Sequence, residues 1–302
     1  MAFTAADVPS QQGKCFIVTG ANAGLGFSAS AVLAAHGARV ILACRSQERA
    51  EAAMARIRAA TPGADLAFLP LDQADIASVR SAAEQVRAEP RIDALVNNAG
   101  VMYPPLVRTA QGFEPQFGVN HLGTFALTAL LLPKLAETPG ARVVITASLA
   151  HRLGKIAWDD LDAHQSYNKA QRYADSKLAN LLFLYELDRR LRAAGSPVTG
   201  VACHPGVAAT ELGRHSRGFN VFVRFFGWML NTADMGAWPT LQAATDPGIA
   251  PGGYYGPQGM GEMRDPSGPA KRKKTATDPE AARRLWDVSV AKTGIDPGLP
   301  SA

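Results

Sequence analysis

The sequence predicts one α/β domain, a doubly wound sheet of the Rossmann type whose strands run parallel and carry helices on both faces. Short apolar runs rich in Val, Ile and Leu alternate with longer stretches of helical periodicity. Strands that are apolar throughout leave no face for water, which is typical of a parallel sheet covered on both sides. No repeat or linker divides the 302 residues, and 47% of them are hydrophobic, so we expect a single domain over residues 1–302.

The elements are expected in alternating order along the chain. Six apolar runs predict the strands, at residues 15–20, 39–44, 66–71, 93–100, 142–148 and 198–206. Helical periodicity predicts the helices, at residues 46–60, 74–89, 112–136 and 166–193, and a basic loop with a short helix at 264–293. The helices at 112–136 and 166–193 are apolar over more than one face, so we expect a homodimer or homotetramer formed through them.

Composition narrows the function classes. The 31 Lys and Arg against 26 Asp and Glu give a formal charge of +5, a mixed surface that favours a phosphate-bearing small ligand over nucleic acid. Cys15, Cys44 and Cys203 stand apart in apolar runs without metal-ligand spacing, which indicates reduced core residues, no metal site and a cytoplasmic protein. The chain opens without a signal-peptide pattern, and no stretch reaches the roughly 18 apolar residues of a membrane span.

Two segments keep more than one interpretation. The apolar stretch 219–230 predicts a buried or substrate-facing helix, with contact to a membrane surface as the alternative. The basic run from Lys271 to Lys274 is interpreted as a solvated loop, against a contact with anionic lipid or nucleic acid.

A glycine-rich turn, "TGANAGLG" at residues 19–26, follows the first expected strand and opens a helix. Glycines there let backbone N–H groups approach a pyrophosphate, and the helix N-terminus adds a partial positive charge. The spacing G-x-x-x-G-x-G differs from the G-x-G-x-x-G of common dinucleotide sites, so a purely structural turn is the alternative. The cofactor contacts that we expect from this turn are Gly20, Asn22, Gly24, Leu25 and Gly26.

Positions at the ends of the next strands indicate which nucleotide the turn would hold. Where NAD sites carry an acidic residue, about 20 positions past the glycines, this chain has Cys44 followed by Arg45. An arginine there accommodates a 2′-phosphate, which favours NADP(H) over NAD(H), with a plain surface arginine as the alternative. Asp72, at the end of the third strand, is placed to accept a hydrogen bond from an adenine amino group.

The stretch "YADSK" sets Tyr173 and Lys177 on one face of an expected helix. An ammonium beside a phenol lowers the phenol's pKa from about 10, and a tyrosine so tuned acts as a general acid or base. By itself the pair is equally typical of an ordinary helix surface. Ser148 closes the fifth strand and Asn120 lies ahead of that strand, and ligands of open α/β sheets bind where the carboxyl ends of the strands meet. We therefore expect all four side chains at one site.

Together these motifs resemble the short-chain dehydrogenase/reductase family over residues 14–256. The matching features are "TGANAGLG", "NNAG" at 97–100, Asn120, Ser148, "YADSK" and "HPG" at 204–206, in the family's order and spacing. Within the family, "ILACRS", "VNHLGTF" and "YADSKLANLLF" look like the retinol dehydrogenase and protochlorophyllide reductase branch, whose members favour NADP(H). The resemblance implies hydride transfer between a nicotinamide and a carbonyl/alcohol pair.

The resemblance also implies roles for single residues. Tyr173 would be the catalytic acid/base, Ser148 would hold the substrate oxygen, and Lys177 would bind the nicotinamide ribose and lower the tyrosine pKa. Asn120 would hold the water through which the proton reaches solvent. The further cofactor contacts that the resemblance implies are Asn98, Val207 and Thr210.

Other functions fit the sequence less well. A hydrolase with Ser148 as nucleophile would need the glycine-flanked turn that "TASLA" lacks. A sugar-nucleotide epimerase would need a larger C-terminal lobe. A cofactor-binding sensor or scaffold typically loses the tyrosine or the lysine, and both are present here. His151 and His204 have no partner at metal or triad spacing, and His204 is interpreted as structural or pocket-lining.

The segment after "HPG", which covers the substrate in this fold, is crowded with aromatic residues between Phe219 and Trp228. Burying apolar ligand surface contributes about 25 cal/mol per Å², so a long or cyclic apolar carbonyl or alcohol compound is the expected substrate. The alternative is that these aromatic side chains pack onto the core or a second subunit.

Overall fold

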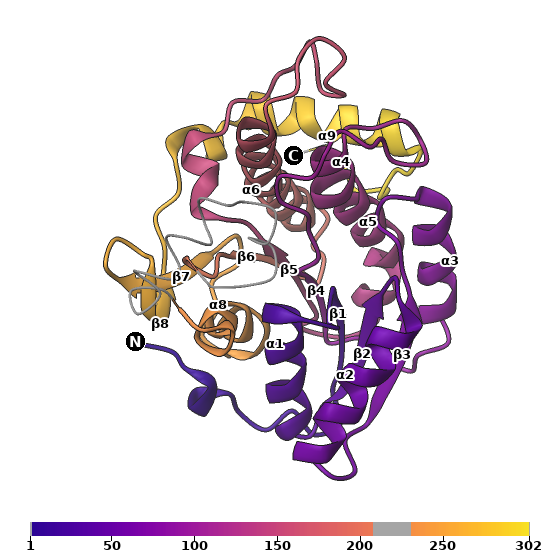
Figure 1. Ribbon diagram of the computed structural model, residues 1–302, viewed down its shortest axis with the longest axis vertical. Helices are drawn as coiled ribbons and strands as arrows, with labels where there is room; N and C mark the ends of the chain where they lie inside the picture. Colours follow the sequence, from indigo (N-terminus) through magenta and orange to yellow (C-terminus); the bar gives the residue numbers. More distant parts are fainter. Residues whose placement is uncertain (1, 208–230, 302) are drawn as a thin grey trace.

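The computed structural model of the protein describes residues 2–207 and 231–301. Eight strands form one sheet in the order β3-β2-β1-β4-β5-β6-β7-β8, and β8 alone among them runs antiparallel to its neighbour (Figure 1). The strands are β1 Cys15–Thr19, β2 Arg39–Cys44, β3 Leu66–Pro70, β4 Ala94–Asn97, β5 Arg142–Thr146, β6 Thr199–Cys203, β7 Tyr254–Gly259 and β8 Arg264–Pro269. The prediction of a doubly wound, mostly parallel sheet is confirmed.

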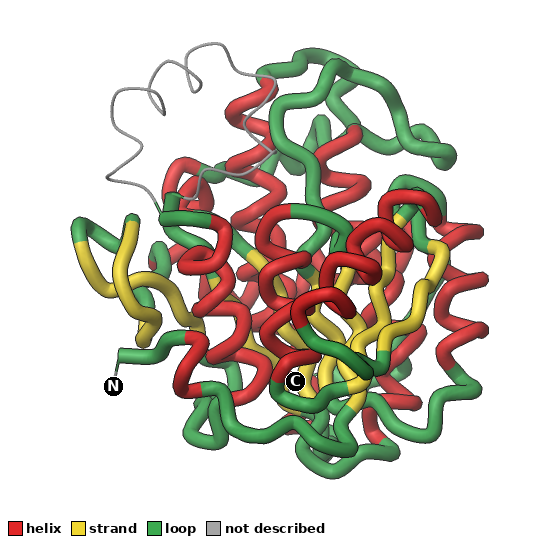
Figure 2. The backbone as a smooth tube through the Cα atoms, turned by 60° about the horizontal axis from the view of Figure 1, so that its bottom comes forward, coloured by secondary structure: helices red, strands yellow, loops and turns green. Residues whose placement is uncertain are grey.

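Helices connect the strands and lie on both faces of the sheet (Figure 2). The helices are α1 Gly24–Ala35, α2 Gln47–Ala60, α3 Ile76–Val86, α4 Pro115–Phe117, α5 Gly123–Ala136, α6 Lys169–Ala193, α8 Ala233–Thr245 and α9 Pro279–Thr293. The shorter turns are η1 Ala5–Asp7, η2 Gly118–Leu122, η3 Leu149–Leu153 and η6 Lys274–Thr277. The start of α6 is fixed by Asn168, whose side-chain oxygen accepts hydrogen bonds from the amides of Ala170 and Gln171, the second and third residues of the helix.

The period-2 alternation of a strand explains why both faces of the sheet are apolar. Along β1, Ile17 packs into the cluster under α3, α5 and α6, whereas Phe16 and Val18 pack into the cluster under α1, α2 and α8. All five β1 residues are buried, because each successive side chain meets a different helix layer. The sheet therefore leaves its carboxyl-terminal edge as the place where polar side chains gather.

The predicted helix at 112–136 is interrupted in the structure. A short α4 leads into the π-helical turn η2, and the regular helix α5 begins only at Gly123. A π turn holds one more residue than an α turn, and such insertions occur frequently at functional sites. Asn120 lies in the middle of this turn. Apolar periodicity could not predict the interruption, because the apolar pattern continues through it.

The expectation of a loose basic loop from residue 264 is wrong. Residues 264–269 form β8, which pairs with β7 as a hairpin, and neither strand was predicted. The sequences "YYGPQG" and "RDPSGP" are rich in Gly and Pro, which are depleted in strands and are tolerated mainly at sheet edges. The sheet itself supplies the order here, since β7 extends it beside β6 and the amide of His204 donates to the Tyr255 carbonyl at 2.9 Å.

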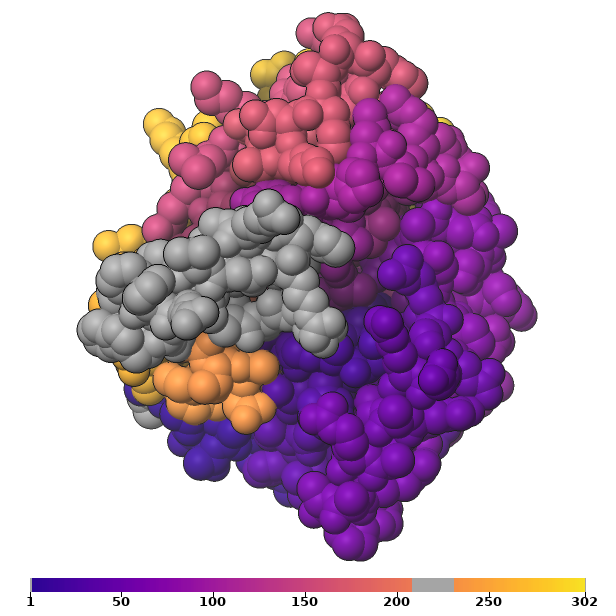
Figure 3. All heavy atoms as spheres, viewed as in Figure 1, coloured from indigo at the N-terminus to yellow at the C-terminus, as the bar shows by residue number. Residues whose placement is uncertain are grey.

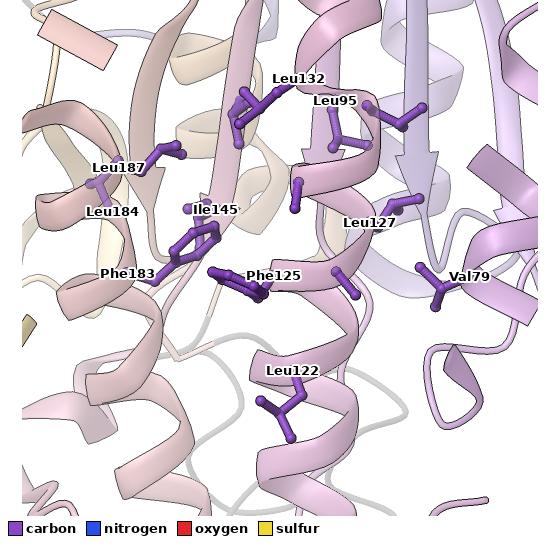
Figure 4. Packing of buried hydrophobic residues seen from close by; sticks show 14 of the residues in the cluster. Val79, Leu95, Leu122, Phe125, Leu127, Leu132, Ile145, Phe183, Leu184 and Leu187 are labelled. Carbon is purple, nitrogen blue, oxygen red and sulfur yellow. The ribbon is translucent and has the colours of Figure 1, made fainter. Parts of the chain in front are cut away.

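The C-terminal helix α9 packs against the apolar faces of α5 and α6. Phe125 of α5 and Phe183 of α6 face each other (Figure 4), and the Trp286 ring of α9 packs 5.3 Å from the first and 5.9 Å from the second. Below these rings, the Ser289 hydroxyl of α9 lies 2.8 Å from the imidazole of His121. Part of the apolar surface that was expected to bind a second copy is therefore covered by Trp286 of the same chain.

No helix within residues 2–207 and 231–301 has the length and apolar character to cross a membrane. The aromatic segment 219–230 lies outside the described residues.

Candidate active site

A cavity of about 640 Å³ opens at the carboxyl-terminal edge of the sheet. In Figure 3 the surface is hollowed where the indigo part of the chain meets the magenta part. The sequence-predicted residues that line the cavity are Gly20, Asn22, Gly24, Leu25, Arg45, Asp72, Asn98, Ser148, Tyr173, Lys177 and Val207. Gly26 and Asn120 lie behind its wall, and Thr210 lies outside the described residues. The sequence-predicted site residues that the structure describes are thus brought together.

The glycine turn has the shape of a cradle. Gly20 and Gly24 adopt φ of +66° and +54°, a left-handed conformation that favours glycine. Ala23, the N-cap of α1, offers no side-chain oxygen to the first amides of the helix. A Cβ on Gly26 would lie 2.5 Å from the Gly20 carbonyl oxygen and 2.6 Å from the Asn98 side-chain nitrogen. The turn thus presents uncapped helix amides to the cavity, and the geometry fits a pyrophosphate.

Asn98 supports this turn from beneath. Its side-chain amide donates to the Thr19 carbonyl at 2.9 Å, and the Thr19 hydroxyl accepts from the backbone amides of Asn98 and Ala99 at 3.0 and 2.9 Å. These bonds join the end of β4 to the end of β1. The "NNAG" motif is therefore part of the frame that holds the turn, in addition to lining the cavity.

The next two strand ends carry the predicted nucleotide-selecting groups. Arg45 lines the cavity, is exposed, and makes no hydrogen bond or ion pair with a described residue. Cys44 beside it is buried, and that burial raises the pKa of its thiol to about 11, so the position is uncharged at neutral pH. The Asp72 carboxylate accepts from the Ala74 amide at 2.9 Å. A dinucleotide with a phosphorylated ribose fits this set, because a free cation stands where NAD sites have a carboxylate.

On the other side of the cavity, Tyr173 of α6 and Ser148 both line the wall. Burial raises the pKa of the Tyr173 phenol to about 12, and the Ser148 side chain opposes that rise. Ser148 is the N-cap of η3, and its hydroxyl oxygen accepts from the Ala150 amide at 3.2 Å. Two hydroxyl groups are therefore held at one point of the wall.

Lys177 lies one turn further along α6 and is buried. Its ammonium donates to the Thr146 carbonyl at 3.1 Å and lies 5.8 Å from the centroid of the Tyr173 ring. Burial lowers the pKa of Lys177 to about 8. Of the three protons of the ammonium, one is used by the Thr146 carbonyl, which leaves donors for a bound ligand.

The side chain of Asn120 hydrogen-bonds to Val101 and Ser176. The side-chain oxygen accepts from the Val101 amide at 2.7 Å, and the nitrogen donates to the Val101 carbonyl and to the Ser176 hydroxyl, each at 3.0 Å. The π turn therefore ties the loop after β4 to the helix that carries Tyr173.

His151 is a residue whose contacts the sequence did not indicate. Its Nε2 accepts from the Lys273 amide at 3.2 Å, so the ring proton resides on Nδ1, which donates to the Ser148 carbonyl at 2.6 Å. The ring stacks edge-on against Tyr254 of β7. Lys273 of the C-terminal segment therefore fixes the His151 ring, and that ring holds the backbone carbonyl of Ser148.

Tyr103 is a second residue of this kind, since it lines the cavity beside Tyr173 without any motif to mark it. Within residues 2–207 and 231–301, no group of three or more His, Cys, Asp or Glu side chains is placed to hold a metal ion.

Comparison with known proteins agrees with this geometry. The family model described as short chain dehydrogenase matches residues 14–219. Human "Retinol dehydrogenase 12" is 41% identical over 291 residues, which cover 94% of this chain and 87% of that protein. Mouse "Polyprenol dehydrogenase" is 42% identical, covering 96% and 87%.

Two solved structures are also similar. An uncharacterized protein from Mycobacterium paratuberculosis has a TM-score of 0.83 at 38% identity and covers 99% of this chain and all of that one. A short chain dehydrogenase from Burkholderia cenocepacia, described in complex with NADP, has a TM-score of 0.65 at 26% identity, covering 81% of this chain and 96% of that one.

Proposed function

The chain belongs to the short-chain dehydrogenase family, and from that premise we propose that it is an NADP(H)-dependent oxidoreductase that interconverts an alcohol and a carbonyl compound. One observation carries the proposal: Ser148, Tyr173 and Lys177 share a cavity with an open glycine turn. When bound, the nicotinamide would supply or accept the hydride, because no amino-acid side chain can transfer one. The protein's residues position the two reactants and move the proton.

Tyr173 is the proposed proton donor and acceptor. With a pKa of about 12 the phenol carries its proton at neutral pH, and it can protonate the alkoxide that forms as a carbonyl is reduced. Alcohol oxidation requires the reverse transfer, which a nearby positive charge favours by lowering the phenol pKa. The Lys177 ammonium is the proposed source of that charge and a donor to the cofactor ribose. Ser148 is proposed to hold the substrate oxygen next to the phenol.

For Asn120 we propose a supporting role. Its side-chain amide is committed to Val101 and Ser176, so a water on the proton path would be held by the backbone of the π turn. Asn98 and Val207 are proposed to flank the cofactor, and Asp72 to accept from the adenine amino group.

The preference for NADP(H) rests on Arg45. A guanidinium that has no partner among residues 2–207 and 231–301, next to an uncharged Cys44, is suited to a 2′-phosphate. An NAD-type ribose would instead be favoured by a carboxylate at this strand end. The Burkholderia cenocepacia relative described with NADP supports the same assignment.

An apolar substrate is proposed because the wall near Tyr173 is itself apolar. Val101, Met102 and Leu149 line the cavity there, with Pro104 at its edge. The relatives named retinol dehydrogenase and polyprenol dehydrogenase are named for long apolar alcohols. Contact with such a chain is stabilised at about 25 cal/mol per Å² of buried apolar surface.

The cytoplasm remains the proposed compartment, since Cys15, Cys44 and Cys203 are buried and unpaired. A homodimer or homotetramer through α5 and α6 remains a proposal, and it would use the parts of these helices that Trp286 of α9 does not cover. The proposed reaction needs no second copy, since one chain supplies the cavity residues that the structure describes.

The test is steady-state turnover of a homologous series of aldehydes with NADPH and with NADH. We expect NADPH to be preferred and catalytic efficiency to rise with chain length until the cavity is filled. Arg45→Ala should reduce the NADPH preference about ten- to a hundredfold, mainly through the NADPH Michaelis constant, because a charge-assisted phosphate contact is lost. Arg87, which pairs with Glu84 away from the cavity, provides the matched control, Arg87→Ala.

Three outcomes would contradict the proposal in different parts. Equal use of both cofactors by the unaltered protein would reject the role of Arg45. A flat or falling chain-length profile would reject the apolar substrate. NADPH binding without turnover of any aldehyde, ketone or alcohol would favour the rival function, a nucleotide-binding sensor.

A further inference from the structure

Tyr103 stands beside the catalytic phenol on the loop after β4. Its ring centroid lies 5.6 Å from that of Tyr173, with the two ring planes at 81°, so one ring meets the edge of the other. Both side chains line the same cavity, and both are half-buried. A substrate that places its oxygen on the Tyr173 hydroxyl must therefore pass next to Tyr103.

The backbone of Tyr103 is held in an unfavourable conformation. Its φ is +58°, in the left-handed region that residues other than glycine rarely adopt. The described residues that share this feature are Tyr103, Ala163, Met260, Glu262 and Asp265. Tyr103 is the member of that group that lines the cavity. Such strain persists where the surroundings enforce it, and it concentrates at functional sites.

Two braces made of hydrogen bonds hold this conformation. The Tyr103 amide donates to the side-chain oxygen of Gln116, a fully buried residue of α4, at 3.0 Å. The side-chain nitrogen of Gln116 donates in turn to the Lys169 carbonyl at 2.9 Å. On the other side, the Tyr167 hydroxyl donates to the Pro104 carbonyl at 2.8 Å.

Both braces lead to the helix that carries Tyr173. Lys169 is the first residue of α6, and Tyr167 lies two residues before it. The loop that holds the Tyr103 ring is thus tied to the frame that positions the catalytic phenol. The ring forms a fixed wall, because the loop that carries it cannot move away from a larger ligand without breaking the hydrogen bonds to Gln116 or Tyr167.

We infer that Tyr103 determines specificity, as a fixed wall that limits the size of one of the two groups on the reacting carbonyl carbon, and that Gln116 is the positioning residue that holds it there. The inference rests on the proposed function. The carbonyl carbon carries two substituents, and with the oxygen on Tyr173 one of them faces the wall. An aldehyde can direct its hydrogen there, whereas a ketone has to fit a carbon group.

The experiment compares octanal with 2-octanone, which have the same number of carbons, using NADPH and the complete chain. The ratio of the two kcat/KM values is measured for the unaltered protein, Tyr103→Phe, Tyr103→Ala, Tyr103→Gly and Gln116→Leu. Tyr185→Phe is the matched control. Tyr185 lies in α6 and is half-buried, as Tyr103 is, but it does not line the cavity.

We expect Tyr103→Ala and Tyr103→Gly to lower the aldehyde-to-ketone ratio at least tenfold, mainly through a lower KM for the ketone. Tyr103→Phe and Tyr185→Phe should leave the ratio within about twofold, since the wall acts by its volume. Gln116→Leu should lower the ratio by an intermediate factor. Tyr103→Gly should also melt at a higher temperature than Tyr103→Ala, because glycine accepts the positive φ that alanine does not.

An unchanged ratio in both small variants would overturn the inference, and so would an equal loss of octanal and 2-octanone activity. If Gln116→Leu does not fold, the Tyr103→Gly result still decides, because that variant does not depend on the brace. Failure of the unaltered protein to turn over either compound would reject the proposed function, and then the melting temperatures alone would report whether Tyr103 is strained.

Discussion

The two sides of the cavity are built on different principles. The glycine-turn side, residues 20–26 with Arg45 and Asp72, is shaped by backbone, and its charged groups are at least partly open to solvent. The tyrosine side relies on side chains, of which Lys177 is buried and Ser148 and Tyr173 are half-buried, and burial shifts the pKa values of Tyr173 and Lys177.

The difference predicts how each side fails. A backbone cradle is sensitive to added volume, because a Cβ meets main-chain atoms that cannot move aside. A buried set of titratable groups is sensitive to the loss of one functional group and to pH. Substitutions on the first side should therefore weaken binding, and those on the second should change the rate and the pH dependence of stability.

The largest effect is expected from Tyr173→Phe, which removes only the hydroxyl. Turnover should fall by about a thousandfold or more, because the proton-transfer group is lost. The dissociation constant of NADPH, followed by its fluorescence, should change less than threefold. Comparable losses of binding and rate would mean that the two sides are not separable.

Lys177→Met should make the cofactor-free protein more stable near neutral pH. The folded pKa of about 8 lies below the unfolded value of 10.5, so the buried charge costs stability at low pH and the cost disappears as pH rises through that window. At pH 7 the gain should be on the order of 3 kcal/mol, and activity should be lost.

The measurement is urea unfolding at pH 7 and pH 10, and the difference between variant and unaltered protein should shrink at the higher pH. Lys155→Met is the control, because Lys155 is exposed and should show no such pH-dependent gain. If the difference in the free energy of unfolding is the same at both pH values, burial does not lower the pKa of Lys177.

Gly26→Ala tests the other side by volume alone. The new methyl group would meet the Gly20 carbonyl oxygen at 2.5 Å, so the turn has to shift and the amides lose their alignment. NADPH affinity should fall at least tenfold, with kcat at saturating cofactor reduced much less. Gly248→Ala is the control, since its nearest neighbour is a flexible aspartate side chain. Unchanged affinity would contradict a cradle made of backbone.

The smallest of these effects is expected for His151. Replacing it with Phe removes the donor to the Ser148 carbonyl, and one hydrogen bond is worth about 1 kcal/mol, or roughly fivefold in kcat. His151→Asn keeps a donor near Nδ1 and should recover part of the loss. The KM for NADPH should not change in either variant. A loss of NADPH affinity instead would mean that His151 supports the glycine-turn side of the cavity and not the tyrosine side.

What the sequence could predict follows the same division. Short-range patterns carry the glycine turn, the alternation of strands and helices and the i, i+4 pairing of Tyr173 with Lys177, because each depends on neighbouring residues. Tyr103, Gln116 and His151 could not be found that way. Their contacts join segments between 3 and 122 positions apart, and the bonds form only when the sheet has brought its loops together.

The C-terminal region shows the same limit on a larger scale. β7 and β8 have Gly- and Pro-rich sequences of low strand propensity, and they are ordered by pairing with an existing sheet edge. The faces of α5 and α6 were correctly recognised as apolar. The packing of Trp286 on these faces was not predicted, because nothing local to residues 112–193 reveals that the C-terminal helix returns to them.

The packing of Trp286 on α5 and α6 affects how the protein folds during synthesis. α5 ends at Ala136 and α9 begins at Pro279, so the ribosome completes the two helices with a long delay between them. At typical translation speeds of 5–20 residues per second, the interval is roughly ten to thirty seconds. During that time the nascent chain carries the ring of Phe125, and after residue 183 also that of Phe183, without the cover of Trp286. We expect chaperones that bind exposed apolar segments to act on this face, and slow synthesis of residues 194–278 to lower the yield of folded protein.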